Sequence, residues 1–220
     1  MSAPSVVVFD VNETLSDLRP LAQRFVEAGA PASLARLWFA SVLREGFALT
    51  AAGGTSRFAD IGREVLLDLL PESVEDRAAA VEHVLGGFMD LDVHPDVVPG
   101  VRALREAGLR LVTMSNGASA VAERLLTRAG IRDDFEQILS VEEAGVWKPA
   151  ADAYRFVARR CAVDVEELVL VAVHPWDTDG AARAGLRSAW VDRDGRHFPT
   201  YATPPTWTVP SIEALAAVLS

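Results

Sequence analysis

Cysteine and lysine are almost missing from this chain of 220 residues, and each scarcity has a consequence. The single cysteine, Cys161, excludes an internal disulfide framework and a metal site built from several thiolates. We expect Cys161 to be a small buried residue of a helix. Lys148 is the only lysine, so arginine carries nearly all of the positive charge. A lysine that occurs once in an arginine-rich chain is a candidate for a specific role.

Basic clusters and long apolar runs are also lacking. The formal net charge is -10, which disfavours nucleic acid as a partner because phosphate binding requires clustered lysine and arginine. No apolar stretch is long enough to cross a bilayer, so we expect no membrane segment. The first residues run into an apolar strand without a recognisable secretion signal. The sequence therefore predicts a cytoplasmic globular protein.

What is present begins with an apolar run that ends abruptly at a carboxylate. Residues 6–9 are Val-Val-Val-Phe, a run of β-formers of the length expected for a buried strand of a parallel sheet. In open parallel sheets, the ligand crevice lies beyond the carboxyl ends of the strands. Asp10 follows this strand directly, so the pattern predicts that its carboxylate lies in the crevice.

The rest of the chain changes from a helical pattern to an alternating one. Apolar residues recur at three- and four-residue spacing in segments near 17–29, 31–50, 55–70 and 73–86. Strand patterns at 109–115, 137–140, 168–173 and 188–191 then alternate with helical patterns near 117–129, 150–162 and 177–185. Strands that alternate with helices are typical of a parallel sheet with helices on both faces.

These patterns predict an α/β protein with a Rossmann-like parallel sheet core and an inserted all-helical cap domain. The core is expected to comprise residues 1–15 and 96–220. The cap, residues 16–95, is expected to cover the carboxyl end of the first strand as a lid. The tail at 202–210 is rich in proline and threonine, and we expect it to cross the surface before a short final helix.

Polar residues gather at the ends of the predicted strands and before one helix. They are Asp10, Asn12 and Thr14 after the first strand, Ser115 and Asn116 after the second, Lys148 before a helix, and His174, Trp176 and Asp177 after a later strand. Taken together, these positions resemble the motifs of the haloacid dehalogenase superfamily. The matches are D-x-x-x-T-L at 10–15, S-N-G at 115–117, K-P at 148–149 and W-D-x-x-G-A at 176–181. Four motifs in the right order are a specific signal.

Within this superfamily, the chain is more similar to the type II, L-2-haloacid dehalogenases than to the phosphatases. Phosphatases of the superfamily carry a second aspartate, a general acid/base, where this chain has Asn12, an amide that exchanges no proton near neutral pH. Their fourth motif carries an acidic pair, of which only Asp177 is left here. Fewer carboxylates weaken a Mg²⁺ site. The resemblance therefore implies no metal and no cofactor, with Mg²⁺ at Asp10 and Asp177 as the alternative.

The resemblance implies that Asp10 displaces the halide from carbon and forms an ester, which water then hydrolyses. A halide leaves without a proton, so no acid is needed at Asn12. Lys148 is expected to orient Asp10, and Asp177 to position or activate the water. Hydrogen bonds to the nucleophile and to the substrate carboxylate are expected from Thr14, Ser115 and Asn116. The expected substrate contacts further include Asn12, Tyr154, His174 and Trp176.

The chain departs from the type II dehalogenases at three places. Those enzymes carry an arginine in the first lid helix, shortly after a tryptophan, that receives the halide. Here Trp38 is followed by Ala40, and Arg44 lies one turn later on the same face. We hypothesise that Arg44 reaches the halide and that Trp38 contacts substrate, with packing inside the lid as the alternative for Trp38. His174 replaces their usual asparagine, and Ala172 a frequent serine.

The sequence thus predicts a hydrolase that acts on the carbon–halide bond of small 2-halo carboxylic acids. Its partner is a small halogenated acid, and the resemblance alone suggests a homodimer. Two alternatives stay open. One is a Mg²⁺-dependent phosphatase of the same superfamily, and the other is a degenerate member that binds a small acid without turnover.

Overall fold

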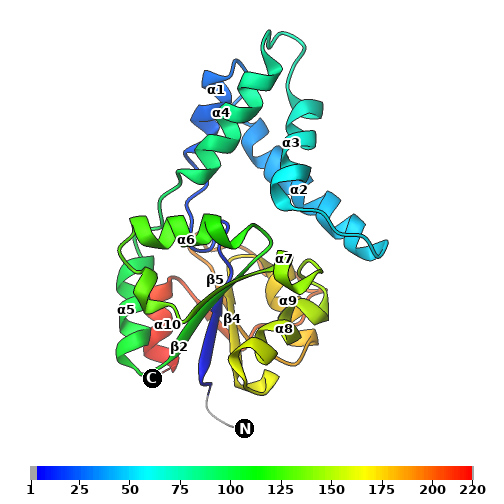
Figure 1. Cartoon of the computed structure of the whole chain (residues 1–220). Helices are drawn as coiled ribbons and strands as arrows, with labels where there is room; N and C mark the ends of the chain where they lie inside the picture. Colours follow the sequence, from blue (N-terminus) through cyan, green and yellow to red (C-terminus); the bar gives the residue numbers. More distant parts are fainter. Residues whose placement is uncertain (1–3, 220) are drawn as a thin grey trace.

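The computed structural model describes residues 4–219, and its centre is a six-stranded parallel sheet (Figure 1). The strand order is β3-β2-β1-β4-β5-β6, which places β1 in the interior of the sheet. The strands are β1 (Val6–Phe9), β2 (Arg110–Ser115), β3 (Gln137–Ser140), β4 (Leu168–Ala172), β5 (Arg187–Val191) and β6 (Trp207–Val209). This is the strand order of a Rossmann fold, so the predicted Rossmann-like parallel core is confirmed.

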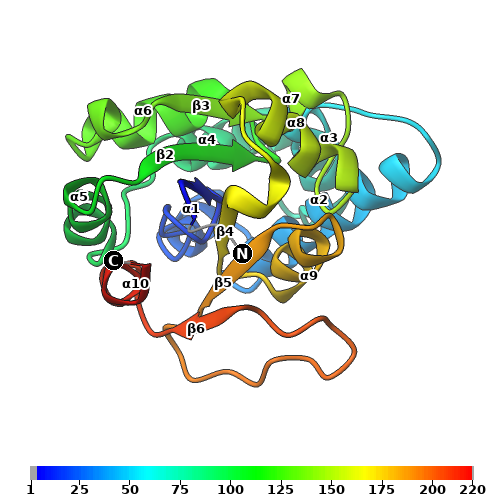
Figure 2. The same ribbon diagram turned by 90° about the horizontal axis from the view of Figure 1, so that it is seen from below.

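Helices cover both faces of this sheet (Figure 2). They are α5 (Val97–Glu106), α6 (Ser119–Arg128), α7 (Val141–Ala144), α8 (Ala151–Cys161), α9 (Pro175–Arg183) and α10 (Ile212–Leu219), with 3₁₀ turns η1 (Arg132–Asp134) and η2 (Val165–Glu167). Val7 and Phe9 pack with α5, α6 and α10, whereas Val6 and Val8 share the other core with α8 and α9. Alternate side chains of a strand point to opposite faces, which explains why all of β1 is apolar.

The segment between β1 and α5 forms a separate layer of helices above the sheet (Figure 1). Its helices are α1 (Leu21–Glu27), α2 (Leu34–Ala51), α3 (Phe58–Leu69) and α4 (Arg77–Met89). Trp38 lies at their centre, with the rings of Phe25, Phe58 and Phe88 at 6.4, 6.2 and 5.7 Å. Its indole N–H donates to the carbonyl of Gly62 at 2.9 Å. The helices of this cap helix bundle therefore pack around an aromatic cluster, which is continuous with the core on one face of the sheet.

The cap helices meet the sheet domain through a close contact between α2 and the loop before α8. A Cβ atom on Gly46 would lie 2.4 Å from the ring of Trp147, so only glycine allows this approach. The indole N–H of Trp147 donates to the carbonyl of Ser56 at 2.9 Å, and its ring stacks on Phe58 at 6.1 Å. These contacts hold α2 and α3 directly over the carboxyl ends of the strands.

Three elements differ from the sequence-based prediction. α5 and α7 were not predicted, and the tail expected to cross the surface contains β6, which pairs with β5 at the sheet edge. α5 carries Pro99 and Gly100, which interrupt a helical pattern in sequence. A Cβ atom on Gly100 would lie 2.6 Å from the backbone of α10, so close packing of two helices explains this glycine. Among residues 4–219, no helix combines the length and apolar character that a bilayer crossing requires.

Candidate active site

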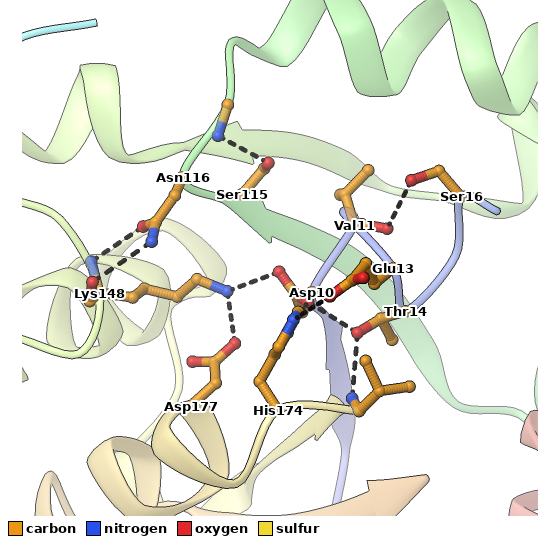
Figure 3. A network of polar contacts seen from close by, with 12 residues as sticks. Asp10, Val11, Glu13, Thr14, Ser16, Ser115, Asn116, Lys148, His174 and Asp177 are labelled. Atoms are coloured by element: carbon orange, nitrogen blue, oxygen red, sulfur yellow. Dashed lines mark hydrogen bonds and ion pairs between the residues drawn. The ribbon is translucent and has the colours of Figure 1, made fainter. Parts of the chain in front are cut away.

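The strand order brings distant polar residues to one edge of the sheet (Figure 3). β1 lies between β2 and β4, and all three run in the same direction. Asp10 follows β1, Ser115 ends β2, and His174 follows β4 after one further residue. The parallel register therefore places these three residues at the same edge, as the sequence predicted for the carboxyl ends of the strands.

Asp10 is the centre of a buried polar cluster. Its Oδ1 accepts a hydrogen bond from Lys148 Nζ at 3.0 Å, and its Oδ2 accepts one from the Thr14 hydroxyl at 2.6 Å. Oδ2 also lies 3.3 Å from His174 Nδ1. Burial alone raises the pKa of Asp10, but Lys148, His174 and Thr14 together hold this pKa well below its usual range. Asp10 is therefore an ionised carboxylate that is only 4% exposed to solvent.

Lys148 is fully buried and is fixed at both ends. Its backbone N–H donates to Asn116 Oδ1 at 3.0 Å, and Asn116 Nδ2 donates back to its carbonyl at 3.3 Å. Its Nζ contacts Asp10 and also Asp177 Oδ2, at 2.6 Å. Burial lowers the pKa of this ammonium, but the two carboxylates outweigh burial and raise it above the ordinary value. Lys148 therefore stays charged between two acids, and Asn116 fixes the backbone that carries it.

Asp177 lies in the first turn of α9, where it is fully buried. Its Oδ1 accepts a hydrogen bond from the Tyr154 hydroxyl at 2.6 Å, so both of its oxygens have a partner. Burial and the nearby charge of Asp10 raise the pKa of Asp177. Burial and the Asp177 charge likewise raise the pKa of Tyr154 well above 10.0, so this phenol stays protonated and donates. A Cβ on Gly180 would lie 2.7 Å from the Tyr154 hydroxyl, which explains the small residue there.

His174 contacts the nucleophile on one side and Glu13 on the other. Its Nε2 lies 2.8 Å from Glu13 Oε2, while Nδ1 is the atom that approaches Asp10. Burial lowers the pKa of His174, but the hydrogen bonds and charges of Asp10 and Glu13 raise it to about 9. His174 is therefore an imidazolium at neutral pH. Glu13 was not among the residues predicted from the sequence, and its own backbone is left-handed, with φ 62°.

Aromatic rings from the cap and from α9 close the space above these charges. The ring of Trp176 lies 5.2 Å from that of His174 and 4.9 Å from that of Phe47 on α2. Phe39, also on α2, lies 6.2 Å from the His174 ring. Lys148 Nζ lies 5.9 Å from the centre of the Trp176 ring. The site is thus enclosed by apolar rings, which strengthens the electrostatic interactions inside it.

The remaining core residues predicted for the site lie in its wall. The Thr14 hydroxyl accepts the backbone N–H of Val173 at 3.1 Å, which orients its hydrogen toward Asp10. Ser115 Oγ accepts the N–H of Gly117 at 2.9 Å, so in this arrangement it stabilises the turn after β2. Asn12 is buried beside Gly117, where a Cβ would lie 3.5 Å from Asn12 Nδ2. Ser115 and Asn12 therefore make no contact with Asp10 among the described hydrogen bonds.

The structure does not bring the two residues predicted from the cap into this cluster. The Arg44 side chain is 70% exposed, and its guanidinium pairs with Glu45 at the surface. Trp38 is fully buried inside the cap helix bundle, so it packs there rather than facing the site. Phe39 and Phe47, on the face of α2 that approaches the core, are the cap residues next to the site.

The donor set does not fit the alternative Mg²⁺ site. That site requires Asp10 and Asp177 as ligands, but the Lys148 ammonium lies between them and contacts both. The second Asp10 oxygen faces His174, a second positive group. Within residues 4–219, no group of three His, Cys, Asp or Glu side chains is arranged to hold a metal ion. A divalent cation at this position would be repelled by two positive charges.

Comparison with known proteins identifies the family. A model of haloacid dehalogenase-like hydrolases matches residues 4–185. Haloacetate dehalogenase H-2 of Moraxella sp. (strain B) is 30% identical over 133 residues, which are 60% of this chain and 59% of that enzyme. The (S)-2-haloacid dehalogenase of Pseudomonas sp. (strain YL) is 26% identical over 95% of this chain and 91% of its own.

A solved structure gives the same result in three dimensions. The L-2-haloacid dehalogenase of Xanthobacter autotrophicus, with chloropropionic acid covalently bound, superposes with a TM-score of 0.85 and is 25% identical. The alignment covers 98% of both chains, so it includes the cap helices as well as the sheet. The buried Asp10 cluster, the fold and the family match agree, and this chain belongs to the haloacid dehalogenase-like hydrolases.

Proposed function

We propose that this protein is a hydrolytic dehalogenase that acts on small 2-halo carboxylic acids through an ester at Asp10. The observation that carries the proposal is the state of Asp10, a buried carboxylate that Lys148 keeps ionised at 3.0 Å. The relatives support the substrate class, since they include (S)-2-haloacid dehalogenases and an enzyme with chloropropionic acid covalently bound.

In the first step, an Asp10 oxygen attacks the carbon that bears the halogen, and the halide leaves with the bonding electrons. The apolar rings of Phe39, Phe47 and Trp176 exclude water, which leaves the carboxylate poorly solvated and more reactive. No proton is needed by the leaving halide, so the amide of Asn12 is sufficient at a position where a phosphatase requires an acid. Lys148 and Thr14 fix the orientation of the attacking carboxylate.

In the second step, water attacks the ester carbonyl and releases the 2-hydroxy acid. Asp177 holds the Lys148 ammonium, and hydrogen bonds with Asn116 hold the Lys148 backbone. The ammonium is thus placed to stabilise the negative oxygen that develops on Asp10. Both Asp177 oxygens are already engaged with Lys148 and Tyr154. We therefore assign Asp177 the role of positioning Lys148 and the water.

We further propose that residues 16–95 act as a movable cap. Support comes from the helices α1–α4, which pack on one another around Trp38, and from the enclosed site beneath α2. Asp10 is 4% exposed and both Lys148 and Asp177 are fully buried, so a substrate reaches the nucleophile only when the cap and the core separate. Substrate exchange then requires the contact of Gly46 with Trp147 to open.

The proposal includes turnover without a metal or an organic cofactor, because Lys148 supplies the positive charge that a metal would supply. A homodimer and a cytoplasmic location stay predictions from the sequence. Sedimentation of the purified chain measures the first, and fractionation of cells that produce it measures the second.

A single assay panel tests the proposed function. Halide release is measured from 2-chloro-, 2-bromo- and fluoro-carboxylic acids, beside phosphate release from phosphate esters, each with Mg²⁺ and with a chelator. We expect halide release that a chelator does not affect, and a loss of at least about 10⁴-fold in the variant Asp10→Asn. Phosphate release that depends on Mg²⁺, without halide release, would favour the phosphatase. If a folded protein releases neither halide nor phosphate, the result would favour a degenerate family member that binds a small acid without turnover.

A further inference from the structure

Three residues, Glu13, His174 and Asp10, form a line of contacts that ends at the nucleophile (Figure 3). Glu13 Oε2 lies 2.8 Å from His174 Nε2, and the opposite ring nitrogen, Nδ1, lies 3.3 Å from Asp10 Oδ2. A carboxylate that accepts the Nε2 proton fixes the tautomer of a neutral histidine, which leaves the Nδ1 lone pair directed at the other partner. Here that partner is the residue that becomes the ester.

The backbone of Glu13 is held in an unfavourable conformation. Its φ of 62° lies in the left-handed region, which glycine adopts readily and a glutamate rarely does. Such strain at a residue typically costs about 1–3 kcal/mol and persists only where the surroundings impose it. His94 contributes to this by contacting the Glu13 carbonyl at 3.1 Å. The strained residue thus carries the one carboxylate that contacts His174 from the side away from Asp10.

The position of the His174 ring is fixed by more than its two polar contacts. The ring stacks on Trp176 at 5.2 Å and lies beside Phe39 of the cap at 6.2 Å. Only 11% of the side chain is exposed. A ring held on four sides, with one nitrogen directed at the reacting carboxylate, meets the geometric requirement for a general acid or base.

Hydrolysis of an aspartyl ester requires a base to take a proton from water, and Asp177 is poorly placed for this. Its Oδ2 is bound to Lys148 Nζ and its Oδ1 to the Tyr154 hydroxyl, each at 2.6 Å. Burial raises the pKa of Asp177, but both of its oxygens are occupied by these donors, and neither contacts Asp10 among the described hydrogen bonds. Three side chains hydrogen-bond to Asp10 among the described residues, namely Lys148, Thr14 and His174. Of these three, only histidine ordinarily changes its protonation state near neutral pH.

We propose that His174 is the general base of ester hydrolysis and that Glu13 is the residue that positions it. The proposal rests on the proposed dehalogenase function and adds a catalytic residue and a positioning residue to it. In the neutral ring, Nε2–H donates to Glu13, and Nδ1 accepts the proton of a water that attacks the ester carbonyl of Asp10.

Ester formation itself converts His174 from an acid into a base. Before the reaction, the charges and hydrogen bonds of Asp10 and Glu13 raise the pKa of His174 to about 9, so the ring is protonated at neutral pH. The ester has no charge, so the contribution of Asp10 disappears, and burial then lowers this pKa toward neutrality. The other two charged groups of the cluster, Lys148 and Asp177, pair with each other, and α2 places the apolar ring of Phe39 beside His174.

The protons and bonds balance through this sequence. Attack by Asp10 forms a C–O bond and breaks the carbon–halogen bond, and His174 then releases one proton to solvent. Water next forms a bond to the ester carbonyl carbon while Nδ1 takes one of its protons. Collapse breaks the bond to the 2-hydroxy acid, whose oxygen takes the proton of the new Asp10 carboxyl. Asp10 is again a carboxylate, His174 is again an imidazolium, and one halide and one proton have been released.

The variant His174→Ala tests the proposal because it separates the two steps. The His174 side chain makes no hydrogen bond that caps α9, so the helix is expected to form without it. We expect His174→Ala to release about one halide per enzyme and then stall, with hydrolysis slowed by 10²–10⁴-fold, roughly the effect of losing a general base. Intact mass spectrometry of the protein mixed with 2-chloropropionate should show the ester, and peptide mapping should place it on Asp10.

A matched control is available in the cap. His83 Nε2 lies 2.8 Å from Glu27 Oε2, the same pair at the same distance but at the surface. His83→Ala should accumulate no ester and should turn over like the wild type. If His174→Ala is folded and hydrolyses as fast as the wild type, or if it forms no ester while the wild type releases halide, the proposal is overturned.

Glu13→Gln gives a readout that a merely structural role would not change. Without the Glu13 charge, the pKa of His174 in the ester falls further. The rate of single-turnover hydrolysis increases with pH as His174 loses its proton, and the midpoint of this increase should lie at a lower pH than in the wild type. We expect the plateau rate to fall by about tenfold, because an amide orients the ring less well than a carboxylate. An unshifted pH profile would contradict the role of Glu13. A wild type that releases no halide from any 2-halo acid would instead overturn the proposed function.

Discussion

The sheet domain and the cap differ in how well their site residues could be predicted from the sequence. Every site residue predicted from the sheet domain lies in or beside the buried cluster around Asp10, whereas neither residue predicted from the cap does. In a parallel sheet, the end of a strand is a fixed place, so a residue there has one direction to face. On α2, a shift of one residue rotates the side chain by about 100°, so helix packing decides which residue faces the site.

The largest expected difference between the two regions is the effect on stability of removing one positive charge. Lys148→Met leaves two buried carboxylates without their shared cation, and we expect the free energy of unfolding to fall by about 3–5 kcal/mol, measured by urea denaturation. Arg57→Met, which breaks an exposed ion pair with Asp60 in the cap, should leave the free energy of unfolding nearly unchanged, because water screens such a pair. Equal effects of the two variants would contradict the central position given to Lys148.

A second prediction separates packing in the cap from catalysis. Trp38→Ala removes the centre of the cap core, and we expect it to lower the free energy of unfolding by about 3–5 kcal/mol. At a temperature where the variant is folded, its kcat/KM for a 2-halo acid should stay within about tenfold of the wild type, since Trp38 does not face the site. A large loss of activity at unchanged stability would restore Trp38 as a substrate contact.

A third prediction concerns the dependence of stability on pH. The pKa of His174 is raised to about 9, so this residue stabilises the folded state fully below pH 6.5, its ordinary pKa. The stabilisation is lost as pH rises through 9. The unfolding free energy of the wild type, relative to that of His174→Asn, should therefore decrease by about 3 kcal/mol between pH 6 and 10. The same comparison with His83→Asn in the cap provides the control, and a pH-independent difference would show that His174 is not charged.

The smallest expected effect is that of Arg44→Ala. The Arg44 guanidinium lies at the surface beside Glu45, so its loss should change the free energy of unfolding by less than about 0.5 kcal/mol. Halide release and inhibition by added halide should both match the wild type. A weaker inhibition by halide would show that Arg44 enters the site when the cap moves, and would revise the comparison between cap and core.

The elements that could be predicted from the sequence are those determined by the pattern of residues within a short segment. The run from Val6 to Phe9 is apolar because both faces of β1 are covered, and the alternation after residue 109 corresponds to β2–β5 and their helices. Asp10, Lys148 and Asp177 could be identified because each lies in a short motif of the family. Ser115 was expected at the nucleophile but binds Gly117.

The parts that could not be predicted depend on contacts between distant segments. Glu13 and His174 are 161 residues apart, and no local pattern indicates that they meet. α5 contains a proline and a glycine that argue against a helix in sequence, yet its packing against α10 requires the glycine. β6 lies within a tail rich in proline, and it forms because β5 offers an open edge.

The occurrence of lysine at a single position, inside the active site, gives the protein a built-in spectroscopic probe. Lysine labelled with ¹⁵N would yield one side-chain resonance, from the Nζ that lies 3.0 Å from the nucleophile and 2.6 Å from Asp177. Such a signal needs no assignment, and it responds when Asp10 loses its charge to the ester. Both chemical steps and the opening of the cap could thus be followed in the unmodified enzyme, through the chemical shift and hydrogen exchange of one ammonium group.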